Sequence, residues 1–117
     1  MKKIILLIFI VVAFSSSCGS ESLKILKWGP NEAKIGTIPN KQPDGKMGIW
    51  IDVNTTEGLG DIQILFAGKP APTAVQPKLV TAGITPEEFA IAGDKTIEMK
   101  IVSTGQIIPV GNFKVIP

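Results

Sequence analysis

Cys18 is the only cysteine in this chain of 117 residues, and a lone thiol has few chemical uses. A catalytic cysteine needs a histidine or another base to lower its pKa, and the chain has no histidine. A single cysteine can form no disulfide within the chain, and it lacks the partners of a zinc site. Covalent modification, or a disulfide between two chains, therefore remains for Cys18.

Acidic side chains lie in or beside two stretches that we expect to be loops: Asp44 and Asp52 near the first, Glu57 and Asp61 near the second. Carboxylates on neighbouring loops can bind Ca²⁺, which takes about six to eight oxygen ligands. The spacing matches no calcium-loop motif, and turns favour Asp for backbone reasons. We therefore expect solvated loop charges and no metal site, and we keep Asp44, Asp52 and Glu57 as candidate binding residues.

Trp50 is the fourth candidate binding residue. In the stretch MGIWIDV it points away from Met47, Ile49 and Ile51 if the stretch is a strand. An outward indole could be a platform for a carbohydrate or a protein. It could also face the core, or lie in a strand covered on both faces, and we favour a buried or partly covered ring. Trp28, just before a Gly-Pro pair, is expected to plug the end of the domain.

No catalytic set can be assembled from the side chains that remain. Glu87 and Glu88 are adjacent carboxylates, a pattern used in acid–base chemistry, but Thr85, Pro86 and Glu88 form a capping box at the start of a short helical turn. Without His, Tyr or Arg, only Ser, Lys and carboxylates could supply a nucleophile and its base. We expect a protein that is not an enzyme and needs no cofactor.

The N-terminus has the layout of a secretory signal: Lys2 and Lys3, then an apolar run over 4–14, then three serines. The run has 11 residues, well short of the roughly 20 that cross a bilayer as a helix. Residues 15–18, Ser-Ser-Ser-Cys, resemble the lipobox of bacterial lipoproteins, although Ser15 stands where that family prefers Leu. An ordinary signal-peptide cleavage site also fits these small residues.

The lipobox resemblance implies a division of the N-terminal residues. Residues 1–17 are then a signal peptide that is removed, Cys18 is acylated, and residues 18–22 are a tether to the membrane. Gly19 follows the cysteine where inner-membrane lipoproteins often carry Asp, so the resemblance favours the outer membrane.

The charge of the chain argues against nucleic acid as a partner. Removal of residues 1–17 takes two of the 12 lysines, which leaves 10 basic and 10 acidic side chains. Every basic side chain is a lysine, whereas nucleic-acid sites use clustered Lys and Arg.

Short apolar runs between Gly- and Pro-containing turns predict an all-β, antiparallel sandwich of about seven strands over residues 23–117. Regular alternation over 47–53, 61–66 and 96–102 predicts strands with one buried and one solvated face. Weaker strand candidates are 23–28, 33–37, 78–82 and 113–116, and we expect the helical turn at 85–89 to cross between the sheets.

From about residue 24 to 116 the chain resembles the IPT/TIG branch of immunoglobulin-like domains. The matching positions are Pro30, Phe66 with Gly68, Ile84 with Pro86, and Gly93. The resemblance implies an immunoglobulin-like fold and a non-enzymatic role as a protein-interaction module for an envelope partner. The alternative is a small-ligand or carbohydrate-binding domain that uses Trp50 and the loops at 39–46 and 54–60.

Overall fold

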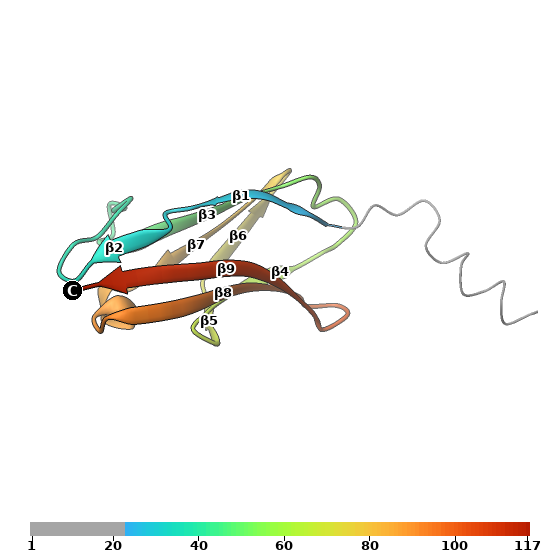
Figure 1. Cartoon of the computed structure of the whole chain (residues 1–117). Coiled ribbons are helices and arrows are strands. Elements are labelled where there is room, and N and C mark those ends of the chain that lie inside the picture. The colour runs from blue at the N-terminus through green and yellow to red at the C-terminus, as the bar shows by residue number, and fades with distance from the viewer. Residues whose placement is uncertain (1–22) are drawn as a thin grey trace, which may run out of the picture.

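The computed structural model describes residues 23–117, and the predicted signal peptide, Cys18 and the tether lie outside the described residues. From Leu23 onward the chain is all-β, with nine strands and one short 3₁₀ helix (Figure 1). No helix in this part of the chain is long and apolar enough to cross a membrane.

The strands form two sheets. Sheet A has the order β1-β3-β7-β6, with the bounds Ile25–Gly29, Met47–Val53, Leu79–Ile84 and Thr73–Gln76. Sheet B has the order β2-β9-β8-β4-β5, with the bounds Glu32–Lys34, Gln106–Ile116, Gly93–Ile101, Ile62–Phe66 and Lys69–Ala71. All neighbours are antiparallel except β2 and β9, which run parallel.

The prediction of an all-β chain is confirmed, and the three alternating runs are β3, β4 and β8. Two short strands, β5 and β6, raise the count from about seven to nine, and the parallel pair of β2 with β9 corrects the purely antiparallel expectation. The sequence did not predict β5 and β6 because prolines lie in or beside them, at positions 70, 72 and 77. Proline is depleted in strands and confined mostly to edge strands.

Strand β9 is longer than expected. The stretch PVGN at 109–112 reads as a turn, yet it lies inside β9 beside a register shift between Ile97 and Glu98 of β8. A β-bulge of this kind takes up one extra residue and bends the strand without ending the pairing.

The chain passes from one sheet to the other five times, between β1 and β2, β2 and β3, β3 and β4, β5 and β6, and β7 and β8. The connection from β1 to β2 passes through Pro30, and the connection from β5 to β6 lies at Pro72. There the Thr73 hydroxyl donates to the Ala71 carbonyl oxygen (2.8 Å) and accepts from the Ile64 amide (3.0 Å), which ties β6 to β4 in sheet B. The connection from β7 to β8 is the 3₁₀ helix η1 (Pro86–Phe89), which crosses between the sheets as expected.

The two sheets share one apolar core. Ile49, Ile51 and Val80 from sheet A and Ile64 and Met99 from sheet B are fully buried. No polar or charged side chain of residues 23–117 is buried with them. Both sheets therefore place one apolar face inward, which is compatible with a β-sandwich.

Three phenylalanines close the core at the η1 end. The Phe113 ring lies 5.9 Å, centroid to centroid, from both Phe66 and Phe89, and it meets Phe89 edge to face. Glu88 Oε2 accepts hydrogen bonds from the Thr85 amide (3.2 Å) and the Thr85 hydroxyl (3.0 Å), and this cap holds the turn that directs Phe89 inward.

Trp28 of β1 reaches across to sheet B. The ring is half-buried and packs against the core, directly over Gly111 of β9. A methyl group built on Gly111 would lie 2.6 Å from Trp28 Cζ2, so the ring needs a glycine there. Gly111 lies within β9, away from its ends, so Trp28 covers the side of the core between β1 and β9 and not the end expected from the sequence.

We expect Phe113→Ala to destabilise the domain strongly. Loss of a fully buried ring that two other rings contact should lower the free energy of unfolding by about 3–5 kcal/mol. Urea denaturation followed by circular dichroism measures the change. Leu26→Ala is the matched control: Leu26 is 63% exposed, and its loss should alter stability by only about 0.5 kcal/mol. Equal losses for the two variants would contradict the assigned core.

Candidate functional site

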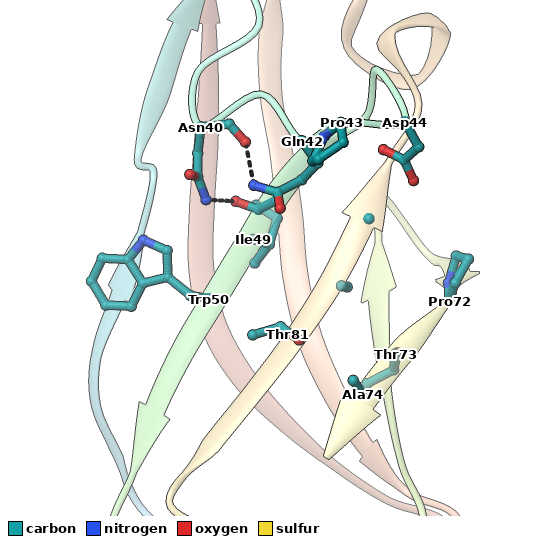
Figure 2. Close-up of a pocket in the computed structure, with 13 residues that line it drawn as sticks. Asn40, Gln42, Pro43, Asp44, Ile49, Trp50, Pro72, Thr73, Ala74 and Thr81 are labelled. Carbon is teal, nitrogen blue, oxygen red and sulfur yellow. Dashed lines mark hydrogen bonds between the residues drawn. The ribbon is translucent and has the colours of Figure 1, made fainter. Parts of the chain in front are cut away.

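A groove of about 620 Å³ lies on the outer face of sheet A (Figure 2). Its lining comes from the loop before β3, from β3 itself, from β7, and from β6 with the residue before it. The lining residues are Asn40, Gln42, Pro43, Asp44, Gly48, Ile49, Trp50, Pro72, Thr73, Ala74, Thr81, Ala82 and Gly83.

Small residues on two neighbouring strands make the groove. Gly48 of β3 pairs with Gly83 of β7, and Thr81 lies between Trp50 on one side and Ala74 on the other. These positions alternate with Ile49 and Ala82, whose side chains are buried. The short side chains leave room on the outer face of the sheet, which the Asn40 and Gln42 amides enter over Gly48 and the Lys46 side chain enters over Gly83.

Two amide side chains on the loop form the upper wall. Asn40 Nδ2 donates to the Gly48 carbonyl oxygen (2.8 Å), and Gln42 Nε2 donates to the Asn40 carbonyl oxygen (2.9 Å), as Figure 2 shows. The Gly48 amide also donates to the Asn40 carbonyl oxygen (3.0 Å). These bonds fix the amide nitrogens, and no donor among residues 23–117 occupies Asn40 Oδ1 or Gln42 Oε1.

Asp44 lies at the same wall of the groove and also stabilises the loop itself. Its Oδ1 accepts a hydrogen bond from the Lys46 amide (2.9 Å), which stabilises the tight turn of the loop. The carboxylate is exposed and lines the groove, so it contributes both to the turn and to the site.

Trp50 borders the groove on the β1 side. Its indole packs over Gly29, where an added methyl group would lie 2.7 Å from Trp50 Cζ2. Figure 2 shows the ring turned toward β1, away from Thr73 and Ala74. The side chain is half-buried, the outcome favoured from the sequence, and within the described chain no acceptor holds its Nε1–H. Part of the ring is thus exposed, and its donor keeps its hydrogen-bonding capacity.

The structure brings only some of the predicted binding residues together. Trp50 and Asp44 line the same groove, and Asp52 follows Trp50 on the outer face of β3, paired with Lys27 and Leu79. Glu57 lies apart, in a second hollow of about 430 Å³ with Val75 and Gln76. This hollow is at the opposite end of sheet A, because β3 separates Asp44 from Glu57.

The four acidic residues do not form a cation site. Within residues 23–117, no group of three or more His, Cys, Asp or Glu side chains is placed to hold a metal ion. The Glu57 backbone amide instead donates a hydrogen bond to Thr55 Oγ1 (3.1 Å), as in a polar turn.

The sequence predicted two parts of the groove, Trp50 and the loop at 39–46, but not the part that β6 and β7 supply. Within that loop Asn40 and Gln42 were not singled out, because their contribution depends on the loop folding back over Gly48. A signal was present in the small residues at alternate positions, Gly48 in one strand and Thr81 and Gly83 in another. These small residues predict a groove only when it is known that β3 and β7 are neighbours in the sheet.

These features define the class of molecule: an all-β domain of two sheets with an open groove on the outer face of one sheet. No protein-family model matches the chain, and no curated protein matches it in sequence. The groove and the surface of the domain therefore carry the functional argument.

We expect Gly29→Ala to displace the Trp50 indole, because the new methyl group would overlap the ring. The Trp50 Nε1–H peak in a ¹H–¹⁵N correlation spectrum should move strongly, with a loss of about 1–3 kcal/mol in stability. Gly83→Ala is the matched control on the same sheet, since its methyl group would meet only the flexible Lys46 side chain. An unmoved Trp50 peak in Gly29→Ala would show that the ring lies elsewhere.

Proposed function

We propose that this chain is a non-enzymatic lipoprotein of the bacterial cell envelope that acts as a protein-interaction module. Its folded part is an immunoglobulin-like domain, of the IPT/TIG type that the sequence resembles. The lipid is on Cys18, and the outer membrane is the location that Gly19 favours.

The order of the strands supports the immunoglobulin-like assignment. Immunoglobulin-like sandwiches have one sheet with the order A-B-E-D and a second with the strands C, F and G. The order β1-β3-β7-β6 corresponds to A-B-E-D, and β9-β8-β4 corresponds to G-F-C. In this lettering β2 and β5 are additional edge strands of the second sheet.

One observation carries the interaction role: three of the four exposed isoleucines in residues 23–117 lie at the end of the domain away from Leu23, and the fourth, Ile107, lies near the start of β9 at the other end. Ile35, Ile91 and Ile116 are 43%, 73% and 39% exposed. The Ile35 amide donates to the Ile116 carbonyl oxygen (2.8 Å), and Ile91 lies just before the start of β8 at this same end. Figure 1 shows β1 beginning at one end of the domain and the C-terminus lying at the other.

This arrangement suits a tethered receptor. An acyl anchor at Cys18 would be five residues from Leu23, so the membrane lies at the end where β1 begins. Several acyl chains on one protein hold it firmly to a bilayer. The isoleucine end then faces away from the membrane, and exposed apolar clusters of this kind mark protein-binding surfaces.

The groove of sheet A favours a second candidate function, the binding of a small ligand or a carbohydrate. Its volume of about 620 Å³ and its half-buried Trp50 are features of ligand sites, and neither is needed for docking through the isoleucine end.

We expect the membrane-associated protein to carry acyl chains on Cys18. Intact-mass analysis of protein from the membrane fraction should show the mass of a chain that starts at Cys18 plus lipid. Cys18→Ala should shift the protein to the soluble fraction, because it removes the acceptor sulfur. Unchanged membrane attachment of the variant, with no acyl mass in the wild type, would contradict the lipoprotein proposal.

We expect the partner to contact the isoleucine end. A photo-crosslinking amino acid at position 91 should give a discrete adduct with an envelope protein in intact cells, and Ile116→Asp should abolish that adduct. Position 102 is the matched control, because Val102 is 49% exposed and follows β8 at the opposite end. Adducts of equal yield from both positions would contradict the assignment of this end.

A further inference from the structure

We propose that the groove on the outer face of sheet A binds a neutral saccharide chain. The inference rests on the second candidate function and names its ligand class. The sugar rings lie over Thr81, beside the Gln42 and Lys46 side chains that cover Gly48 and Gly83, and the chain reaches the Trp50 indole at the β1 side.

The shape of the groove suits sugar rings. Small-molecule sites have volumes of roughly 300–1,000 Å³, and the groove encloses about 620 Å³. Its floor has no side chain larger than threonine between Trp50 and Ala74 along one row of paired residues. A pyranose ring presents a flat face of C–H groups, which can approach such a floor closely and can lie against an indole.

The polar groups around the groove match hydroxyl groups. A sugar hydroxyl both donates and accepts hydrogen bonds, so it needs acceptors and donors at the rim. Asn40 Oδ1 and Gln42 Oε1 are free acceptors within the described chain, and Trp50 Nε1–H is a free donor. The bonds from the Asn40 and Gln42 amide nitrogens hold these groups in place before a ligand arrives, which lowers the entropy lost on binding.

The charge of the groove indicates a neutral sugar. Asp44 is the only charged residue among the described residues that line the groove, and the Lys46 side chain covers Gly83 beside it. A carboxylate or sulfate on a sugar would therefore meet one charge of each sign, Asp44 and Lys46, and would gain no net attraction. Asp44 can still accept bonds from hydroxyls, since the Lys46 amide occupies only Oδ1.

The same geometry disfavours a peptide in the groove. The floor belongs to β3 and β7, which are paired with strands on both sides, so their backbone groups are not open to an added strand. The adjacent edge strand β6 has four residues and is bracketed by Pro72 and Pro77, which limits strand addition. The groove offers side-chain groups and a flat floor, which serve a saccharide better.

The test uses the full-length protein in detergent and isothermal titration calorimetry. The probes are neutral hexasaccharides (gluco-, xylo- and manno-oligosaccharides), an oligogalacturonate as the charged probe, and decaproline as the peptide probe. We expect at least one neutral hexasaccharide to bind and the oligogalacturonate to bind at least about tenfold more weakly. Binding of decaproline or oligogalacturonate alone, or of no probe, would overturn the proposal.

Two variants place the binding in the groove. Thr81→Phe fills the floor while leaving the buried face of β7 unchanged, and it should weaken binding by at least about tenfold. Thr56→Phe, in the second hollow, is the matched control and should bind as the wild type does. Equal binding by both variants would overturn the site, and circular dichroism checks that each is folded. Crosslinking from position 91 is unaffected by either result, so failure here is distinguishable from failure of the interaction role.

Discussion

The alternation of β3 is the constraint on which both the core and the groove depend. Met47, Ile49 and Ile51 point inward and are fully buried, so the register of β3 in sheet A is fixed by the burial of large side chains. A shift by one residue would expose all three, which makes other registers costly. The same register sets the neighbours on the outer face of the sheet. It pairs Gly48 with Gly83, and Trp50 with Thr81.

The edge strand β1 is held to this framework by two tryptophans that lie on glycines. Trp50 packs over Gly29 from the outer face of sheet A, while Trp28 reaches from β1 across the core to Gly111 of β9. One contact therefore secures β1 within its own sheet and the other ties it to the second sheet. Strand β1 therefore supports both Trp50, which borders the groove, and Trp28, which covers one side of the core. A change in β1 should affect the groove and the stability of the fold together.

The pattern of neighbouring residues was sufficient to predict the all-β class, the strands with regular alternation and the helical turn at η1. Alternating burial and helix capping both depend on residues that are close together in the sequence. The pattern could not predict β6 or the bulged part of β9, where Pro72 and Pro109 read as breaks and only pairing with a neighbouring strand shows otherwise. The site follows the same rule. Trp50 was visible as an outward ring, but Asn40 acquires its place only when the loop folds onto Gly48, a contact between separate segments.

The groove opens toward the isoleucine end of the domain, and Leu23 lies at the opposite end. The loop that carries Asn40 and Asp44 precedes β3, and this is the end of β3 that pairs with Ile84, close to η1. Ile35, Ile91 and Ile116 lie at that same end of the domain, whereas the Lys24 amide donates to Asn54 Oδ1 (2.6 Å) at the other. A protein partner at the isoleucine end would therefore lie near the mouth of the groove. A tether at the Leu23 end would leave both surfaces accessible at once, so a saccharide and a protein partner need not compete for the domain.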